Sequence, residues 1–179
     1  MNVRLPPLHT ARLRLVPCAA SVARAAEAGG ADAVEQILGV HVHPSWPSAD
    51  LREILVSYAD AVDADPSMLG WGLWLVLDAR GRNLVGDVGF KGPPGDDGSI
   101  EIGYGIVPPC RRKGFATEAV RALLSWAWSQ PGVRRIDARC YAVNEASMGV
   151  LTKAGFELQG GEAGILEWSM DAQAAHRHP

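Results

Sequence analysis

Three consecutive cations and a glycine, Arg111 to Gly114, have the residue types to bind an anion. The residues before them, 99–107, alternate with the period of two that is typical of a strand, and Pro108-Pro109 ends that strand. Helical spacing follows over 114–129. Backbone N–H groups at a helix start lack intrahelical partners, and the helix dipole favours anions there, so the loop is suited to hold a phosphate. The alternative is an ordinary basic loop that caps a helix.

A second pair of polar residues, Asn144 and Ser147, lies at the start of another predicted helix, 145–154. Asparagine is a favoured N-cap, and Gly155 occupies the position after the helix that favours a left-handed backbone. Asn144 is therefore predicted to cap this helix. The Ser147 hydroxyl one turn later either takes part in chemistry or only helps to satisfy the donors at the helix start.

Together the two groups resemble the GNAT superfamily of N-acetyltransferases. The pattern Arg-x-x-Gly-x-Ala at 111–116 is similar to the loop that holds the pyrophosphate of acyl-CoA. The pattern Asn-x-x-Ser at 144–147, continued by Val-Leu-x-Lys-x-Gly-Phe at 150–156, is similar to the CoA-proximal helix. The likeness covers 84–170. The segment Thr-x-Arg-Leu-x-Leu at 10–15 resembles the opening strand of the Rim-type branch, which acetylates protein N-termini and related amines.

The resemblance implies direct transfer of an acetyl group from acetyl-CoA to a primary amine, either a protein N-terminus or a small molecule, with no metal. Backbone N–H groups near Ile106 and Val107 would polarise the thioester carbonyl, and pantetheine would pair with the strand edge. The implied CoA-binding residues are Ile106, Val107, Arg111, Arg112, Lys113, Gly114, Phe115, Ala116, Thr117, Asn144 and Ser147.

The proton donor for the leaving thiolate departs from the commonest pattern. Many members have a tyrosine seven residues after the asparagine, and this chain has Leu151 there, which cannot donate a proton. The Rim-type branch uses a serine three residues after the asparagine instead, which is Ser147 here. Ser147 is therefore predicted as the donor.

The amine must attack in its neutral form, and deprotonation at pH 7 costs about 1 kcal/mol for an α-amine and about 4–5 kcal/mol for a lysine. Glu101 is the first candidate base, because it shares a strand face with Gly103 and Gly105. Asp87 and Tyr104 follow. Against this assignment, an acidic residue on a strand is also commonly solvated or part of an ion pair.

The same residues also permit other functions. A CoA-binding or regulatory module of the same fold without turnover stays open. Cys110 and Cys140 would permit a ping-pong route, but small buried apolar roles explain them as well. His41 and His43 lack the further ligands that a metal site needs. No P-loop or GxGxxG pattern follows a strand, which disfavours a nucleotide-binding regulator.

Composition limits the class of protein. The chain has 179 residues, 47% of them hydrophobic and 21% charged, as an ordinary globular domain does. A net charge of −3 argues against general nucleic-acid binding. Its three cysteines lack CxxC spacing and cannot all pair, which indicates a cytoplasmic compartment. No membrane span or signal segment is expected. Dimers are frequent among similar proteins, so a homodimer stays open.

The order of predicted elements is strand, helices, three antiparallel strands, helix, strand, helix and two strands. This order indicates an α/β (α+β) fold, with a mixed, mostly antiparallel GNAT-like sheet of about seven strands and helices on both faces. Helices are expected over 19–29, 31–38 and from 48 to about 61, the last capped by Ser48. Residues 1–171 are expected to form one acetyltransferase domain, and 172–179 a disordered tail.

Overall fold

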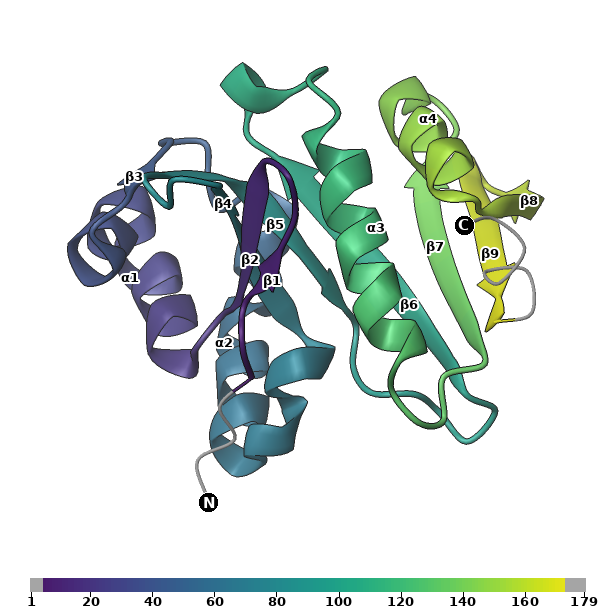
Figure 1. Cartoon of the computed structure of the whole chain (residues 1–179), viewed down its shortest axis with the longest axis horizontal. Coiled ribbons are helices and arrows are strands. Elements are labelled where there is room, and N and C mark those ends of the chain that lie inside the picture. The colour runs from purple at the N-terminus through teal and green to yellow at the C-terminus, as the bar shows by residue number, and fades with distance from the viewer. Residues whose placement is uncertain (1–4, 173–179) are drawn as a thin grey trace.

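The elements follow the predicted order in a computed structural model, which describes residues 5–172 (Figure 1). The strands are β1 (Leu8–His9), β2 (Leu13–Pro17), β3 (His41–Val42), β4 (Leu73–Asp78), β5 (Asn83–Phe90), β6 (Ser99–Ile106), β7 (Arg135–Tyr141), β8 (Glu157–Glu162) and β9 (Ile165–Asp171). The helices are α1 (Ala20–Leu38), α2 (Ala49–Ala64), α3 (Phe115–Trp128) and α4 (Glu145–Ala154), with 3₁₀ turns η1 (Pro66–Trp71) and η2 (Pro108–Cys110).

The strands form one sheet in the order β1-β2-β4-β5-β6-β7-β9-β8, with β3 beside β5. Only β3–β5 and β6–β7 are parallel, so the mixed, mostly antiparallel sheet is confirmed. The described residues contain nine strands rather than about seven. The two extra strands, β1 and β3, have two residues each, which is too short to show a period of two in the sequence.

Helices cover both faces of the sheet, as predicted (Figure 1), and a hydrophobic cluster lies on each face. On one face α3 and α4 pack on the sheet around Val120, Leu123 and Leu151. On the other, α1 and α2 pack over its N-terminal half around Val34 and Leu55. The face of β6 that carries α3 is therefore distinct from the face that looks toward α1 and α2.

The helix boundaries agree with the sequence patterns in most places. Ser48 caps α2 by accepting a hydrogen bond from the Leu51 N–H at 3.2 Å. The two helices expected between 19 and 38 form a single element that is kinked at Gly30, where φ is 61° and ψ is −143°. Of the predicted tail only Ala172 lies within the described residues. No helix in residues 5–172 is long and apolar enough to cross a bilayer.

Strand β6 pairs with its two neighbours over different lengths. It runs antiparallel to β5 from Ile102 to Ile106 and parallel to β7 only from Ser99 to Ile102. Beyond Ile102 the two parallel strands diverge, and a gap opens beside the C-terminal half of β6. This gap lies next to the loop that leads into α3, so the fold itself brings the two sequence motifs together.

The direction of the β6 backbone determines which amides face the gap. Hydrogen-bonding groups of an antiparallel ladder point alternately to the two sides of a strand. The Val107 N–H donates to the Val85 carbonyl at 3.0 Å, on the β5 side. The N–H groups of Tyr104 and Ile106 therefore point the other way, toward the gap left by β7.

Candidate active site

A cleft of about 770 Å³ lies where β6 diverges from β7, between β6, the N-terminus of α3 and α4. It joins the two motifs that the sequence singles out. The predicted CoA-binding residues that line it are Ile106, Arg111, Arg112, Gly114, Phe115, Ala116, Thr117, Asn144 and Ser147. Tyr104 lines it too. Val107 and Lys113 are not among the lining residues.

The loop before α3 has two residues with left-handed backbone, Arg112 at φ 61° and Gly114 at φ 81°. Gly114 is the N-cap of α3, and no side chain caps that helix start. Such alternation of backbone conformation turns successive N–H groups into a concave anion site. The loop therefore offers free amide donors at the positive end of a helix dipole, as a phosphate group requires.

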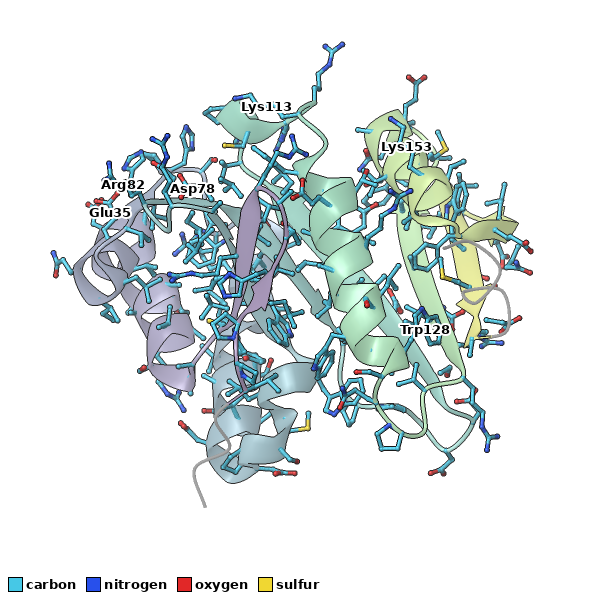
Figure 2. All side chains as sticks on the ribbon, viewed as in Figure 1. Glu35, Asp78, Arg82, Lys113, Trp128 and Lys153 are labelled. Atoms are coloured by element: carbon cyan, nitrogen blue, oxygen red, sulfur yellow. The ribbon has the colours of Figure 1, made fainter. Side chains whose placement is uncertain are left out.

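The cations of the loop have different roles in the geometry. Arg111 Nε donates to the Ile106 carbonyl at 2.9 Å, so this side chain braces the end of β6. Lys113 lies outside the cleft, at the same end of the molecule as Lys153 of α4, which lines it (Figure 2). The cleft mouth thus carries positive charge from both α3 and α4 sides.

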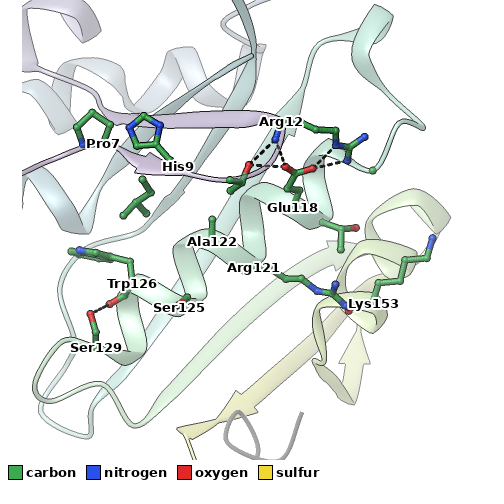
Figure 3. Close-up of a pocket in the computed structure, with 14 residues that line it drawn as sticks. Pro7, His9, Arg12, Glu118, Arg121, Ala122, Ser125, Trp126, Ser129 and Lys153 are labelled. Atoms are coloured by element: carbon green, nitrogen blue, oxygen red, sulfur yellow. Dashed lines mark hydrogen bonds and ion pairs between the residues drawn. The ribbon is translucent and has the colours of Figure 1, made fainter. Parts of the chain in front are cut away.

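Arg12 in the turn between β1 and β2 holds this loop from outside (Figure 3). Its guanidinium contacts the Glu118 carboxylate at 2.6 and 2.7 Å and donates to the Lys113 carbonyl at 2.9 Å. It also lies 4.8 Å from the centroid of the Phe115 ring. The Glu118 carboxylate also accepts from the Thr10 hydroxyl at 2.6 Å. The opening segment is thereby fixed to the first turn of α3.

A second hollow of about 980 Å³ lies between β1 and α3 and is larger than the cleft (Figure 3). Most charged side chains that line it already pair with other groups of the protein. Arg12 and Glu118 pair with each other, and Arg121 donates to the Lys153 carbonyl. Of the residues of the two motifs it contains only Gly114, Thr117 and Lys153, and neither Asn144 nor Ser147. We therefore place the active site in the smaller cleft.

At the start of α4, Asn144 is the predicted cap. Its side chain accepts from the Ser147 N–H at 3.0 Å. The Ser147 hydroxyl is not needed for capping, and it lies close enough to the Tyr104 hydroxyl that their side-chain hydrogen bond lowers the pKa of Tyr104 in part. The Tyr104 hydroxyl donates to the Ser147 carbonyl at 3.2 Å and so links β6 to α4. Burial raises the pKa of Tyr104 to about 12, which makes its hydroxyl a weaker acid than an ordinary tyrosine.

Besides Lys113, two predicted site residues lie outside the cleft lining, Val107 and Glu101. Val107 is buried, and its N–H is already used by Val85, so this amide is not free for a thioester carbonyl. Of the two amides expected to act there, only that of Ile106 faces the gap. Glu101 lies on the part of β6 that is still paired with β7 and forms an ion pair with Lys91. It does not line the cleft.

Asp87, the second candidate base, lies on β5 directly opposite Gly105 of β6. Trp46 Nε1 donates to its carboxylate at 2.9 Å. Burial raises the pKa of Asp87 to about 7, and the Trp46 hydrogen bond only partly opposes this. The sequence gives no sign of the Trp46 contact, since tryptophan in a loop before a helix is usually a packing residue.

Cysteine and metal chemistry find little support in the described residues. Cys18, Cys110 and Cys140 are free thiols, of which Cys18 and Cys140 are buried. Burial raises the pKa of Cys18 to about 12, and the nearby Asp87 charge adds to the effect. Within residues 5–172 no three His, Cys, Asp or Glu side chains come together in an arrangement that could hold a metal ion.

Comparison with known proteins agrees with this geometry. Residues 12–157 match the model of the family described as "Acetyltransferase (GNAT) domain". The chain is 33% identical over 161 residues to the uncharacterized N-acetyltransferase YjdG of Bacillus subtilis, which covers 90% of this chain and 95% of that one. It is 29% identical over 130 residues to the probable N-acetyltransferase YjcK of the same organism, over 72% and 70% of the two chains.

Solved structures with the same fold include the ribosomal-protein-S5-alanine acetyltransferase of Vibrio fischeri, with a TM-score of 0.68, 16% identity and coverage of 93% and 96%. RimL, a ribosomal L7/L12 α-N-protein acetyltransferase solved with coenzyme A, has a TM-score of 0.64, 15% identity and coverage of 94% and 99%. The fold is the one that these acetyltransferases have. The chain belongs to the GNAT acetyltransferase family, and membership makes it an acetyl-CoA-dependent N-acetyltransferase.

Proposed function

We propose that the chain transfers the acetyl group directly, with acetyl-CoA in the cleft on the α3/α4 face and the amine arriving from the opposite face of β6. The gap between β6 and β7 carries this proposal, because it connects the two faces beside Gly105. When both reactants are held at one opening, they no longer have to meet by diffusion in the correct orientation. This positioning removes a large part of the activation free energy.

Different residues of the cleft bind different parts of acetyl-CoA. The amides at the start of α3, with Gly114 allowing close approach, hold the pyrophosphate. The outward N–H groups of Tyr104 and Ile106 pair with pantetheine as an added strand would. Either amide can also stabilise the negative charge that develops on the thioester oxygen. Arg112 and Lys153 at the cleft mouth add positive charge.

Ser147 is proposed as the hydrogen-bond donor to the departing thiolate. It lines the cleft, beside Tyr104. Asn144 already satisfies the Ser147 N–H, so the hydroxyl has no part in capping. Tyr104 is a poorer choice, because its hydroxyl already donates to a carbonyl and its pKa is raised to about 12.

The acceptor is proposed to be an α-amine, of a protein N-terminus or of a small molecule, in the cytoplasm. An α-amine loses its proton at less cost than a lysine. Two structural neighbours motivate the choice, a ribosomal-protein-S5-alanine acetyltransferase and a ribosomal L7/L12 α-N-protein acetyltransferase. Three free thiols agree with a reducing compartment.

The experiment is thiol release from acetyl-CoA with a panel of free-N-terminus peptides, amino-acid amides and alkyl amines. We expect release with at least one amine and initial-rate lines that intersect when both substrates are varied. Parallel lines would instead indicate an acetylated enzyme, for which the Cys110→Ala variant is the check. Absence of release with every amine, despite measurable CoA binding, would favour the non-catalytic module.

A further inference from the structure

One carboxylate on the acceptor side of the sheet has no cation partner. Asp87 points to the α1/α2 face, and no Lys, Arg or His in the described part of the chain lies within 4.0 Å of it. The other acidic residue on this face near the gap, Glu101, is paired with Lys91. Asp87 is therefore the one that retains free capacity to bind a cation.

Its position is fixed by Trp46, which is 2% exposed and comes from the loop between α1 and α2. The indole N–H donates to Oδ1 at 2.9 Å and leaves the second carboxylate oxygen free of protein hydrogen bonds within residues 5–172. The charge of Asp87 helps to raise the pKa of the nearby Cys18 thiol, which burial already keeps neutral. The Tyr58 hydroxyl behind it donates to the Cys18 carbonyl at 2.6 Å.

The β6 residues between Asp87 and the gap, Gly103 and Gly105, have no side chains. A methyl group built on Gly105 would stand 3.4 Å from Asp87 Oδ1, and one built on Gly103 would meet nothing within 4 Å. Neighbouring strands are about 4.8 Å apart. The Asp87 carboxylate therefore lies over Gly105 of β6, and the absence of side chains at Gly103 and Gly105 leaves the space between this carboxylate and the gap open.

We propose that Asp87, held by Trp46, receives the acceptor as an ammonium ion and takes its first proton. This rests on the proposed function and specifies its substrate class: primary amines that are protonated in solution, rather than weakly basic amines that are already neutral. Glu101, the base first expected from the sequence, is the rival.

The proposed reaction begins with removal of one proton from the ammonium ion. The R–NH₃⁺ group gives one proton to the Asp87 carboxylate and becomes R–NH₂. Its lone pair attacks the acetyl carbonyl, so that the C–N bond forms and the C–S bond breaks. The second nitrogen proton passes to the departing thiolate and yields CoA-SH and the amide. Asp87 then returns its proton to solvent, and no oxidant or reductant is involved.

The first test is Asp87→Asn, which keeps the size of the side chain and an oxygen for the Trp46 N–H. General-base assistance is typically worth about 10²–10⁴-fold. We expect kcat/KM for the best amine of the panel to fall by about 10²-fold or more, with CoA affinity unchanged by calorimetry. Hydroxylamine, which is neutral at assay pH, should lose much less rate. Asp60→Asn on α2, an exposed carboxylate outside the site, is the matched control for charge removal.

The second test is Trp46→Phe, which keeps an aromatic wall and removes the N–H donor. The lost hydrogen bond favoured the ionised carboxylate, so the pKa of Asp87 rises further. The acid limb of the pH–rate profile should move to higher pH while the plateau persists. A merely structural role for Trp46 would lower the plateau without moving the limb.

The outcomes separate the two levels of the proposal. A wild-type chain that releases no thiol with any amine refutes the proposed function, and the inference falls with it. A wild-type chain that turns over while Asp87→Asn keeps its rate and pH profile refutes the inference alone. Loss of the acid limb in Glu101→Gln but not in Asp87→Asn assigns the base to Glu101 and likewise refutes it.

Discussion

The two faces of β6 are built in different ways. On the α3/α4 face, the cleft is lined by two short stretches of chain, 104–117 and 144–153. On the α1/α2 face, the groups beside the gap are Asp87, Trp46 and Gly103, from three separate parts of the chain. The cofactor side is thus a local construction that backbone amides dominate, whereas the acceptor side exists only after long-range packing.

This difference explains why the sequence predicts the cofactor but does not predict the acceptor. A phosphate is bound by N–H groups at the start of a helix, and a few neighbouring residues of the right type and spacing provide these groups. An amine site needs a carboxylate, side chains that enclose the amine, and space through which the amine can enter. The residues that provide these features can lie anywhere in the sequence. Each prediction below separates the two faces by one measurable quantity.

The largest effect is expected for Gly103→Val. A Cβ atom placed on Gly103 meets no protein atom within 4 Å, so we expect the fold to tolerate the substitution. It would occupy the open space on the acceptor face and displace the amine, and a misplacement of about 1 Å can cost about 10²-fold in rate. We expect kcat/KM for the amine to fall by about that factor with CoA affinity unchanged, as measured by initial rates and calorimetry. An unaltered rate would mean that the amine does not pass over Gly103.

The next effect is expected for Ser147→Ala on the cofactor face. The variant should lower kcat by roughly 10–100-fold, at or below the lower end of proton-transfer assistance, because the departing thiolate loses its donor. Since Asn144 remains as the cap, the melting temperature should stay close to that of the wild type. A destabilised variant with full kcat would reduce Ser147 to a structural residue.

A smaller effect is expected for Arg12→Ala, which changes the support of the loop and leaves the loop residues themselves in place. Arg12 contacts Glu118 and the Lys113 carbonyl, and hydrogen bonds to charged groups are worth about 1.5–3 kcal/mol. Because the Arg12 side chain is 49% exposed, we expect the lower end of this range, about 10-fold weaker CoA binding with kcat nearly unchanged. Equal losses in CoA affinity and acceptor KM would instead indicate general unfolding.

How far the sequence could predict these features follows from the range of each interaction. The alternation over 99–106, the helix after Gly114 and the Asn144 cap are local and were predicted correctly. The contact of Arg12 with Glu118 spans 106 residues, and that of Trp46 with Asp87 spans 41. The sequence also favoured Glu101 over Asp87 because face alternation cannot show that Lys91 lies beside Glu101.

The smallest effect concerns stability against pH. The pKa of Asp87 is about 7 in the fold and near 3.8 in the unfolded chain, so the folded state retains this proton over a range where the unfolded state has lost it. Asp87 therefore makes the wild type lose stability as pH rises from about 4 to about 7. Asp87→Asn should lack this loss and melt at a higher temperature than the wild type at about pH 8, by about 2–4 °C for each kcal/mol of the difference in a chain of this size. Parallel melting curves for both chains between acid and neutral pH would place the pKa of Asp87 near its ordinary value.

The division between the two faces is tested most directly by residue-resolved amide hydrogen exchange with and without saturating CoA. The account predicts new protection at Tyr104, at Ile106 and in the first turn of α3, because those N–H groups are free until CoA binds. The amide of Val107 already pairs with β5 and should show little change. Protection confined to the α1/α2 side, or no protection at Tyr104 and Ile106 in a chain saturated with CoA, would contradict it.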